Sequence, residues 1–321
     1  MKIDAVITWV NGDDPVHKVK RTTYAGGAVL KSEDKAGETR YVSVGEIYWC
    51  IASLNRFAPW LNKIYIVTDE QNPQLDQFLA ANFPEGHIPI DIIDHKVIFR
   101  GYEENLPTFN SLSIETMTWR IPGLSNHYIE LNDDMFFTGP VLPQDFFTED
   151  GTAVWYVDKI NVFWTWFTRI IKSKSQGLRK VTFKGVMFNA ARILGKKWTF
   201  FKINHTPRAL FKDVYEEFFR DNDELLRANI SHRFRDASQF SPQVLHCHLL
   251  DSQGRCSVRP VKGNHFFFQP KKGQPSYFDK KMTALRSFKG NFVCLNSIDL
   301  ATEEQRRTMK NWIEERLSVK L

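Results

Sequence analysis

The sequence has no stretch of eighteen apolar residues, so we expect no membrane-spanning helix. It has only four cysteines in 321 residues, and no two of them form a CxxC pair. This scarcity favours reduced thiols in a cytoplasmic protein over a disulfide framework. The N-terminal residues Met1-Lys2-Ile3-Asp4 lead directly into an apolar run, so we also expect no signal peptide. Internal repeats and low-complexity segments are absent as well.

Acidic residues are missing from Lys159 to Lys212, although average usage would place about six in these 54 positions. The same segment carries thirteen lysines and arginines. A bias this long and one-sided favours contact with a polyanion over a merely solvated face. The formal net charge of +6 agrees with an anionic partner. The 42% hydrophobic and 25% charged residues are typical of a globular protein and exclude a disordered or fibrous chain.

Short apolar runs alternate with helical patterns in the first part of the chain. The sequence predicts strands at 3–10, 64–68, 90–93 and 127–131. It predicts helices at 44–57, at 74–81 and from Thr108, as the capping residue, to about Arg120. This order indicates an α/β fold with a Rossmann-like, doubly wound and mostly parallel sheet, followed by a more helical, basic second half.

Three of the predicted strands end in polar, mostly acidic clusters, at 11–14, 69–72 and 132–134. Ligands of open α/β sheets bind at the carboxyl ends of the strands, so three clusters on one edge favour a binding site over ordinary polar loops. Asp133 and Asp134 offer the oxygen ligands with which proteins hold Mg²⁺ or Mn²⁺ against a diphosphate.

Two further segments carry residues suited to phosphate chemistry. His205 lies in His205-Thr206-Pro207 and is either a general base or a structural histidine. Arg235 has a planar guanidinium that suits phosphate, although a surface ion pair with Asp236 explains it equally. We reject a structural zinc site at His246-Cys247-His248, because two histidines at i and i+2 of a helix diverge.

Several segments together resemble the Stealth family of sugar-phosphate transferases. The first is Ile3–Asp14. The second comprises Glu46–Ile51, Ala58–Trp60, Ile64–Asp69, Leu106–Ser111, Glu115 and Leu131–Phe136. The third combines His205-Thr206-Pro207 with Lys212 and Arg235, and the fourth is Phe292–Asn296, after which Ser297 stands where an aspartate is frequent. The four regions occur in the family's order and cover most of the chain.

The resemblance implies a glycosyltransferase-A-like core that transfers a hexose-1-phosphate from a UDP-sugar to an acceptor hydroxyl. It would form a phosphodiester, release UMP and serve bacterial capsule or surface-polysaccharide synthesis. Residues 1–150 would bind the nucleotide sugar and a divalent metal, Mg²⁺ or Mn²⁺, and residues 151–321 the acceptor and phosphate, as one catalytic unit.

The resemblance also implies roles for individual residues. The metal ligands would be Asp133 and Asp134, and the catalytic residues His205, Arg235, Lys212 and Asp134. The nucleotide-sugar-binding residues would be Trp9, Asn11, Gly12, Asp13, Asn110, Ser111 and Asn296.

Two other functions fit parts of the composition. A metal-dependent glycosyltransferase that releases UDP would need the same metal and base. Only an analysis of the released nucleotide, UMP or UDP, distinguishes the two enzymes. A nucleic-acid-binding module would suit the basic charge and the aromatic content, but acidic clusters along the predicted sheet edge argue against it. The aromatic and basic segment 161–180 could contact anionic lipid at the inner membrane, line an acceptor groove or form a core helix.

Overall fold

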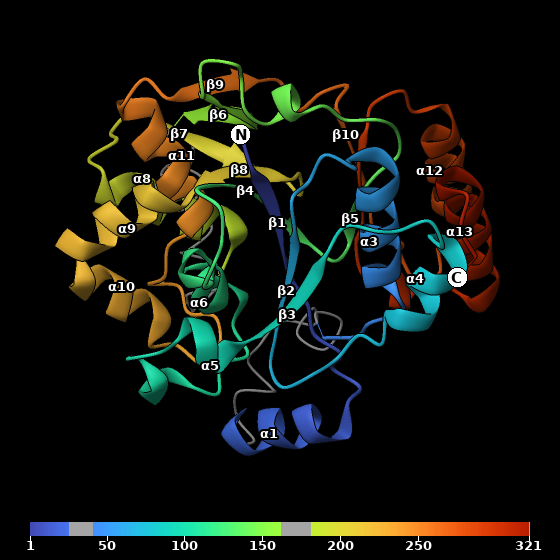
Figure 1. The fold of residues 1–321 in the computed structure, drawn as a ribbon, viewed down its shortest axis with the longest axis horizontal. Coiled ribbons are helices and arrows are strands. Elements are labelled where there is room, and N and C mark those ends of the chain that lie inside the picture. Colours follow the sequence, from blue (N-terminus) through green and yellow to red (C-terminus); the bar gives the residue numbers. More distant parts are fainter. Residues whose placement is uncertain (26–40, 162–180, 321) are drawn as a thin grey trace.

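The computed structural model describes residues 1–25, 41–161 and 181–320, and a five-stranded sheet forms its centre (Figure 1). The strand order is β3-β2-β1-β4-β8, in which the first four strands are parallel and β8 is antiparallel to β4. The bounds are β1 (Ile3–Thr8), β2 (Ile64–Thr68), β3 (Ile90–Asp94), β4 (His127–Asn132) and β8 (Arg208–Phe211). The predicted α/β fold with a Rossmann-like, mostly parallel sheet is therefore confirmed.

Two three-stranded sheets extend this core, with the orders β10-β11-β5 and β7-β6-β9. Their strands are β5 (Met135–Phe137), β6 (Ala153–Asn161), β7 (Thr199–Ile203), β9 (Cys256–Arg259), β10 (His265–Phe268) and β11 (Phe292–Leu295). Strand β11 from near the end of the chain pairs with β5, and β8 pairs with β4. Both halves of the chain thus contribute strands to shared sheets.

Helices flank the sheets on two sides, with α3, α4, α12 and α13 on one flank and α8 to α11 on the other (Figure 1). The α-helices are α1 (Pro15–Ala25), α3 (Glu46–Phe57), α4 (Asp76–Asn82), α5 (His95–Ile98), α6 (Ser111–Glu115), α8 (Phe183–Ile193), α9 (Lys212–Asp221), α10 (Asp223–Ile230), α11 (Pro242–Ser252), α12 (Pro275–Ser287) and α13 (Glu303–Leu317). Within the described residues, no helix combines the length and apolarity that crossing a bilayer requires. The segment predicted at 161–180 lies outside the described residues except for Asn161.

The helix predicted from Thr108 to Arg120 is wrong in its start and its length. Asn110, not Thr108, caps α6 by accepting a hydrogen bond from the Leu112 amide, and α6 ends at Glu115. Beyond it, the Thr116 hydroxyl donates to the Leu112 carbonyl and the Thr118 hydroxyl to the Glu115 carbonyl. Threonine side chains that bond to nearby backbone groups compete with the helix, so a short 3₁₀ turn follows instead.

The parallel register brings the strand ends together at one edge. Thr8 lies beside Val67 of β2 and beside Asn132 of β4, so the chain leaves all three strands at the same level. From β1 the chain adds β2 and β3 on one side of the sheet and then β4 and β8 on the other, so the strand order reverses between β1 and β4. This crevice is where open α/β sheets bind their ligands.

His246 and His248 in α11 have structural roles, in agreement with the rejected zinc site. The His246 Nε2 accepts a hydrogen bond from the Phe211 amide at 3.0 Å, and the His248 Nε2 accepts one from the Phe201 amide at 3.3 Å. Burial lowers the pKa of His246 to about 3. The helix is therefore anchored to β7 and β8 by neutral imidazoles.

This anchoring makes the stability of the fold sensitive to acid. Folding lowers the pKa of His246 from 6.5 to about 3. The contribution of the neutral His246 to the free energy of unfolding is therefore complete above pH 6.5 and is lost progressively as the pH falls from 6.5 toward 3. Between pH 7 and pH 5 we expect this group to reduce the free energy of unfolding by about 2 kcal/mol. Urea unfolding of the wild type and His246→Gln at both pH values measures it. Equal pH dependence in the two proteins would contradict the assignment.

A second stability prediction concerns Asp4 at the start of β1. Its buried carboxylate accepts hydrogen bonds from the Asn62 side chain at 2.8 Å and from the Ser125 amide at 2.7 Å. Loss of both bonds in Asp4→Ala should lower the free energy of unfolding by about 1–3 kcal/mol. The control is Asp91→Ala, which removes only an exposed ion pair with Lys63 and should have little effect. Equal effects of the two substitutions in thermal unfolding would contradict the prediction.

Candidate active site

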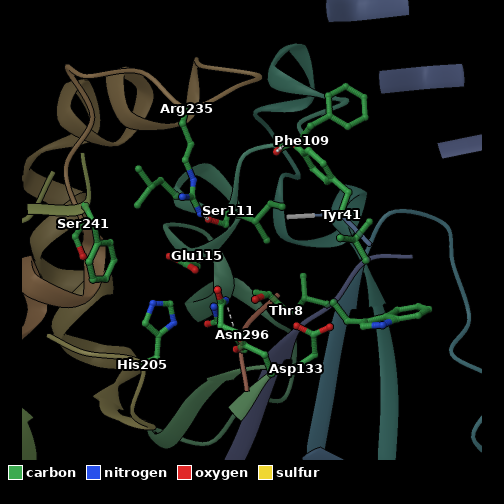
Figure 2. A pocket seen from close by; sticks show the side chains of 18 of the residues that line it. Thr8, Tyr41, Phe109, Ser111, Glu115, Asp133, His205, Arg235, Ser241 and Asn296 are labelled. Carbon is green, nitrogen blue, oxygen red and sulfur yellow. Dashed lines mark hydrogen bonds between the residues drawn. The ribbon is translucent and has the colours of Figure 1, made fainter. Parts of the chain in front are cut away.

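A cavity of about 480 Å³ opens at the carboxyl end of the central sheet (Figure 2). The ends of β1, β2 and β3 line one part of it, which we call the β3 side. The turn after β4, the segment before β8 and the loop that carries Arg235 line the other part, which we call the β8 side. Both parts belong to one continuous cavity.

Three carboxylates line the pocket where these parts join. Glu46 is the first residue of α3, and Asp133 and Asp134 form the turn between β4 and β5. Burial raises the pKa of Glu46 to about 7, and the charge of Asp134 adds to this effect. Burial also raises the pKa of Asp133 well above its usual range, with Glu46 and Asp134 contributing. Carboxylates that raise one another's pKa in this way are stabilised by a bound cation.

The Asp134 side chain is fixed by residues from the end of the chain. Its Oδ2 accepts a hydrogen bond from the Asn296 Nδ2 at 2.8 Å and one from the Cys294 thiol at 3.3 Å. Asn296 is itself held by the Gln269 side chain at 3.1 Å. The other oxygen, Asp134 Oδ1, is buried and has no hydrogen-bond partner among the described residues. One carboxylate oxygen therefore remains available to a ligand.

These observations fit a hard divalent cation such as Mg²⁺ or Mn²⁺. The donors are carboxylate oxygens, which such ions prefer, and one of them lacks a partner. Asp133 and Asp134 could hold such an ion, with Asp134 Oδ1 as one available ligand atom.

His205 faces this carboxylate cluster from the loop between β7 and β8. Its imidazole packs against two aromatic rings. The distance between ring centroids is 5.7 Å to Phe183 and 5.3 Å to Phe267. Burial lowers the pKa of His205; Asp134 opposes this shift, and Arg208 and Arg235 add to it. A neutral imidazole with a buried, unpartnered Nδ1 can accept a proton.

Two guanidinium groups stand near His205. The Nη2 of Arg235 donates a hydrogen bond to the Ser111 hydroxyl at 2.6 Å, and this pair lines the pocket (Figure 2). The buried Arg208 donates to Asn132 Oδ1 at 3.1 Å and to Glu130 Oε1 at 3.4 Å. Positive charge thus lies on the β8 side, opposite the carboxylate cluster.

The β3 side has a different character, because several of its buried polar atoms have no hydrogen-bond partner within residues 1–25, 41–161 and 181–320. These atoms are Trp9 Nε1, His17 Nδ1, His95 Nδ1 and Thr108 Oγ1. Burial lowers the pKa of His95 to about 4, although the charge of Asp69 opposes the shift. The side chains of Tyr41 and Phe109 add aromatic surface. Neutral polar groups beside aromatic rings suit a flat, hydrogen-bonding ligand.

The structure brings together most of the residues predicted for the site. The pocket is lined by Trp9, Ser111, Asp133, Asp134, His205, Arg235 and Asn296.

Lys212 lies elsewhere. It follows β8, which runs antiparallel to β4, and its amide donates to the Asn126 carbonyl before the start of β4. The strand therefore carries Lys212 to the end of the sheet where β4 begins, away from the pocket. The structure does not bring Lys212 into the site.

Four predicted nucleotide-sugar residues do not line the pocket but shape its surroundings. The buried Asn110 uses its side chain on Leu112, His232 and Gln239. Gly12 packs so closely that a Cβ atom would lie 2.2 Å from the Tyr41 carbonyl oxygen. Asn11 forms backbone-to-side-chain hydrogen bonds with Gln71, and its Oδ1 accepts from the Asp13 amide. These residues position Tyr41 and the loop after β1 instead of facing the cavity.

Several pocket residues were not predicted. Glu46 and Arg208 lie within or beside quoted motifs, so their charge in those segments was an available signal. His17 and His95 belong to segments without a recognisable motif, and only the fold brings them together with Asp69.

Solved structures with a similar fold are glycosyltransferases. A galactosyltransferase, LgtC, in complex with donor and acceptor sugar analogs has a TM-score of 0.47 and 12% identity, over 99% of this chain and 96% of that chain. Mouse xyloside xylosyltransferase 1 has a TM-score of 0.37 and 9% identity, over 92% of this chain and 97% of that chain. Similarities this distant carry no argument about activity.

Curated relatives are closer in sequence. The capsular polysaccharide phosphotransferase WcwK of Streptococcus pneumoniae is 29% identical, over 95% of this chain and 93% of its own length. The receptor polysaccharide phosphotransferase WefC of Streptococcus oralis is 28% identical, over 96% of this chain and 94% of its own length. The capsular polysaccharide phosphotransferase LcbA of Neisseria meningitidis is 30% identical, over 73% of this chain and 60% of its own length.

The family descriptions agree with these relatives. Residues 1–28 match conserved region 1 of Stealth proteins, and residues 40–155 match conserved region 2. The two matches include Trp9 and the Asp133–Asp134 pair, both of which line the pocket. The chain belongs to the Stealth family, and it is an enzyme of the phosphotransferase class.

Proposed function

We propose that the enzyme transfers a hexose-1-phosphate from a UDP-sugar to a hydroxyl of a saccharide and releases UMP. The observation that carries this proposal is one pocket whose lining combines Asp133 and Asp134 with His205 and Arg235. Phosphoryl transfer needs an acceptor for a proton and positive charge beside the phosphoryl oxygens, and this pocket offers both. The names of the relatives support a bacterial capsule or surface polysaccharide as the product.

The β3 side supports a nucleotide as part of the donor. A uracil ring carries one N–H donor between two carbonyl acceptors, so it can pair with donors and acceptors at once. Trp9 Nε1 is a donor, and the neutral imidazoles of His17 and His95 can each donate or accept. We assign the base and ribose to this side and the sugar phosphate to the β8 side, with Ser111 and Asn296 between them.

In the proposed reaction the acceptor oxygen attacks the phosphorus that carries the sugar. A new P–O bond forms, the bond between this phosphorus and the bridging oxygen of the diphosphate breaks, and UMP leaves. His205 takes the proton of the attacking hydroxyl. Arg235 and Arg208 lie on the side where the phosphoryl oxygens gain charge, so their guanidiniums lower the energy of the transition state.

Asp133 and Asp134 would hold the divalent cation, with Mg²⁺ as our assignment. When bound, such an ion neutralises charge on the diphosphate oxygens. We assign the reaction to the cytoplasm, where the free thiols of the four cysteines remain reduced.

The first test measures which nucleotide is released, and it includes Asp134→Asn. With Mg²⁺ and a panel of UDP-sugars, we expect UMP from the wild type and a loss of roughly a hundredfold or more in rate from the variant. Asp91→Asn is the matched control, because Asp91 lies on the exposed surface of β3, and it should keep its rate. Release of UDP instead would indicate glycosyl transfer, and a fully active Asp134→Asn would remove Asp134 from the metal site.

A second test addresses the proton acceptor. In His205→Ala we expect kcat to fall by about two to four orders of magnitude while the KM for the UDP-sugar changes little. Lys212→Ala is the control, because the structure places Lys212 at the end of the sheet where β4 begins, and its kcat should stay within about threefold. A change in KM alone would assign His205 to binding, and a large loss in Lys212→Ala would contradict the geometry.

A further inference from the structure

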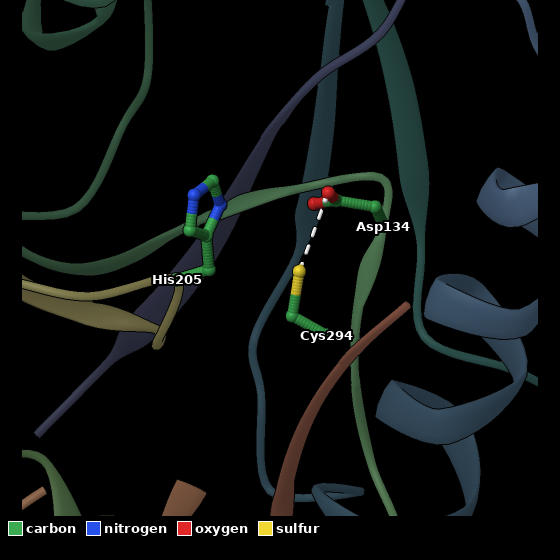
Figure 3. A group of neighbouring side chains, drawn as sticks. All are labelled: Asp134, His205 and Cys294. Atoms are coloured by element: carbon green, nitrogen blue, oxygen red, sulfur yellow. Dashed lines mark hydrogen bonds between the residues drawn. The ribbon is translucent and has the colours of Figure 1, made fainter. Parts of the chain in front are cut away.

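A second set of ligand atoms shares Asp134 with the carboxylate cluster. Asp134, His205 and Cys294 each present one atom that can bind a metal, and these atoms lie within 4.8 Å of one another (Figure 3). They come from three distant segments: the turn after β4, the loop before β8 and strand β11. The Cys294 thiol donates a hydrogen bond to Asp134 Oδ2, with 3.3 Å between the sulfur and the oxygen.

This arrangement already approaches the geometry of a tetrahedral zinc site. With metal–ligand bonds of about 2.0–2.3 Å, neighbouring ligand atoms of such a site are roughly 3.3–3.8 Å apart. The sulfur–oxygen distance between Cys294 and Asp134 falls at the lower end of this range. The Nδ1 of His205 is buried and has no hydrogen-bond partner in the part of the chain that the structure describes, so it can bind a metal without breaking a hydrogen bond seen there.

The donor set differs from that of the carboxylate cluster in its chemistry. Mg²⁺ prefers oxygen ligands and is bound poorly by a thiol or an imidazole, whereas Zn²⁺ is bound well by a combination of sulfur, nitrogen and oxygen. Asp134 and His205 line the pocket and the buried Cys294 thiol lies beside Asp134, so the mixed donor set is adjacent to the all-oxygen one.

We propose that Asp134, His205 and Cys294 form a site for Zn²⁺, or a divalent cation of similar softness, whose occupation inhibits the enzyme. Binding forms a bond from the ion to each of the three side chains, and the Cys294 proton passes to solvent. The lone pair of His205 is then used by the metal and cannot accept the proton of the acceptor hydroxyl. The existence of the site is independent of the proposed function, but the inhibition rests on it.

The test of the site uses Co²⁺, which replaces Zn²⁺ in such sites and reports thiolate ligation by a near-ultraviolet charge-transfer absorption. We expect this absorption when CoCl₂ is added to the wild type and its loss in Cys294→Ser, whose hydroxyl can still donate to Asp134. Competition of ZnCl₂ with a chromophoric chelator should show an affinity at least about tenfold lower for Cys294→Ser and for His205→Gln.

Cys256→Ala is the matched control. Its sulfur lies 4.0 Å from that of Cys247, so this pair is the alternative place where thiols could capture a metal, and it lies outside the pocket lining. We expect Cys256→Ala to keep the absorption. A wild type without the absorption, or an absorption that depends on Cys256 and survives in Cys294→Ser, would overturn the site. The His205→Gln affinity provides the decision if Cys294→Ser fails to fold.

The inhibition is measured separately, as UMP release in saturating Mg²⁺ with increasing ZnCl₂. Relative to each protein's own rate without Zn²⁺, half-inhibition should require at least about tenfold more ZnCl₂ in Cys294→Ser than in the wild type. If Co²⁺ binds through Cys294 but Zn²⁺ leaves UMP release unchanged, the inhibitory role is overturned. If no UMP forms under any condition, the proposed function fails, while the Co²⁺ spectrum still decides the site.

Discussion

The mutual repulsion of Glu46, Asp133 and Asp134 is the constraint on which the active-site region depends. Like charges brought together in a partly buried place disfavour ionisation, and the pKa of Glu46 and that of Asp133 are raised accordingly, chiefly by burial. Such a cluster persists because the surrounding fold fixes it. Asn296 donates to Asp134, and the amide of Val44 donates to Glu46 Oε2 at 2.7 Å. The fold thus holds carboxyl groups where their ionised forms are disfavoured, and a bound cation would favour those ionised forms.

The opposite wall of the pocket supplies the compensating charge in a form that leaves His205 neutral. Arg208 is held in place by Glu130, and burial raises the pKa of Glu130 to about 7, with Glu115 adding and Arg208 opposing. The Gln243 side chain donates a hydrogen bond to Glu115 at 2.8 Å and one to Glu130 at 2.6 Å, and so links the two glutamates. Burial lowers the pKa of His205, and the fixed guanidiniums of Arg208 and Arg235 add to this effect, so a neutral imidazole is ready to accept a proton.

The sequence predicted local elements better than it predicted which side chains would meet. Strand β2 has the predicted bounds, and β1 and β4 differ at one end only, because each is a short apolar run bounded by polar turns. The resemblance grouped Lys212 with His205, whereas the extended, antiparallel β8 carries the chain across the sheet and away from the pocket. Asn110 was read as a ligand, but a buried asparagine before a helix is equally suited to capping. The grouping of Asp134 with His205 and Cys294 joins segments far apart in sequence, so no spacing rule indicates it.

The same long-range contacts bear on how the two predicted halves of the chain relate. The first half ends in β4 and β5, whose partners β8 and β11 lie in the second half. A chain cut near residue 150 would leave the edge of β4 unpaired and the buried Glu130 without Arg208, and each unpaired buried polar group costs about 1–3 kcal/mol or more. It would also release Asp134 from Asn296. Since these losses approach the total stability of an ordinary domain, we expect neither part of the chain to fold stably without the other.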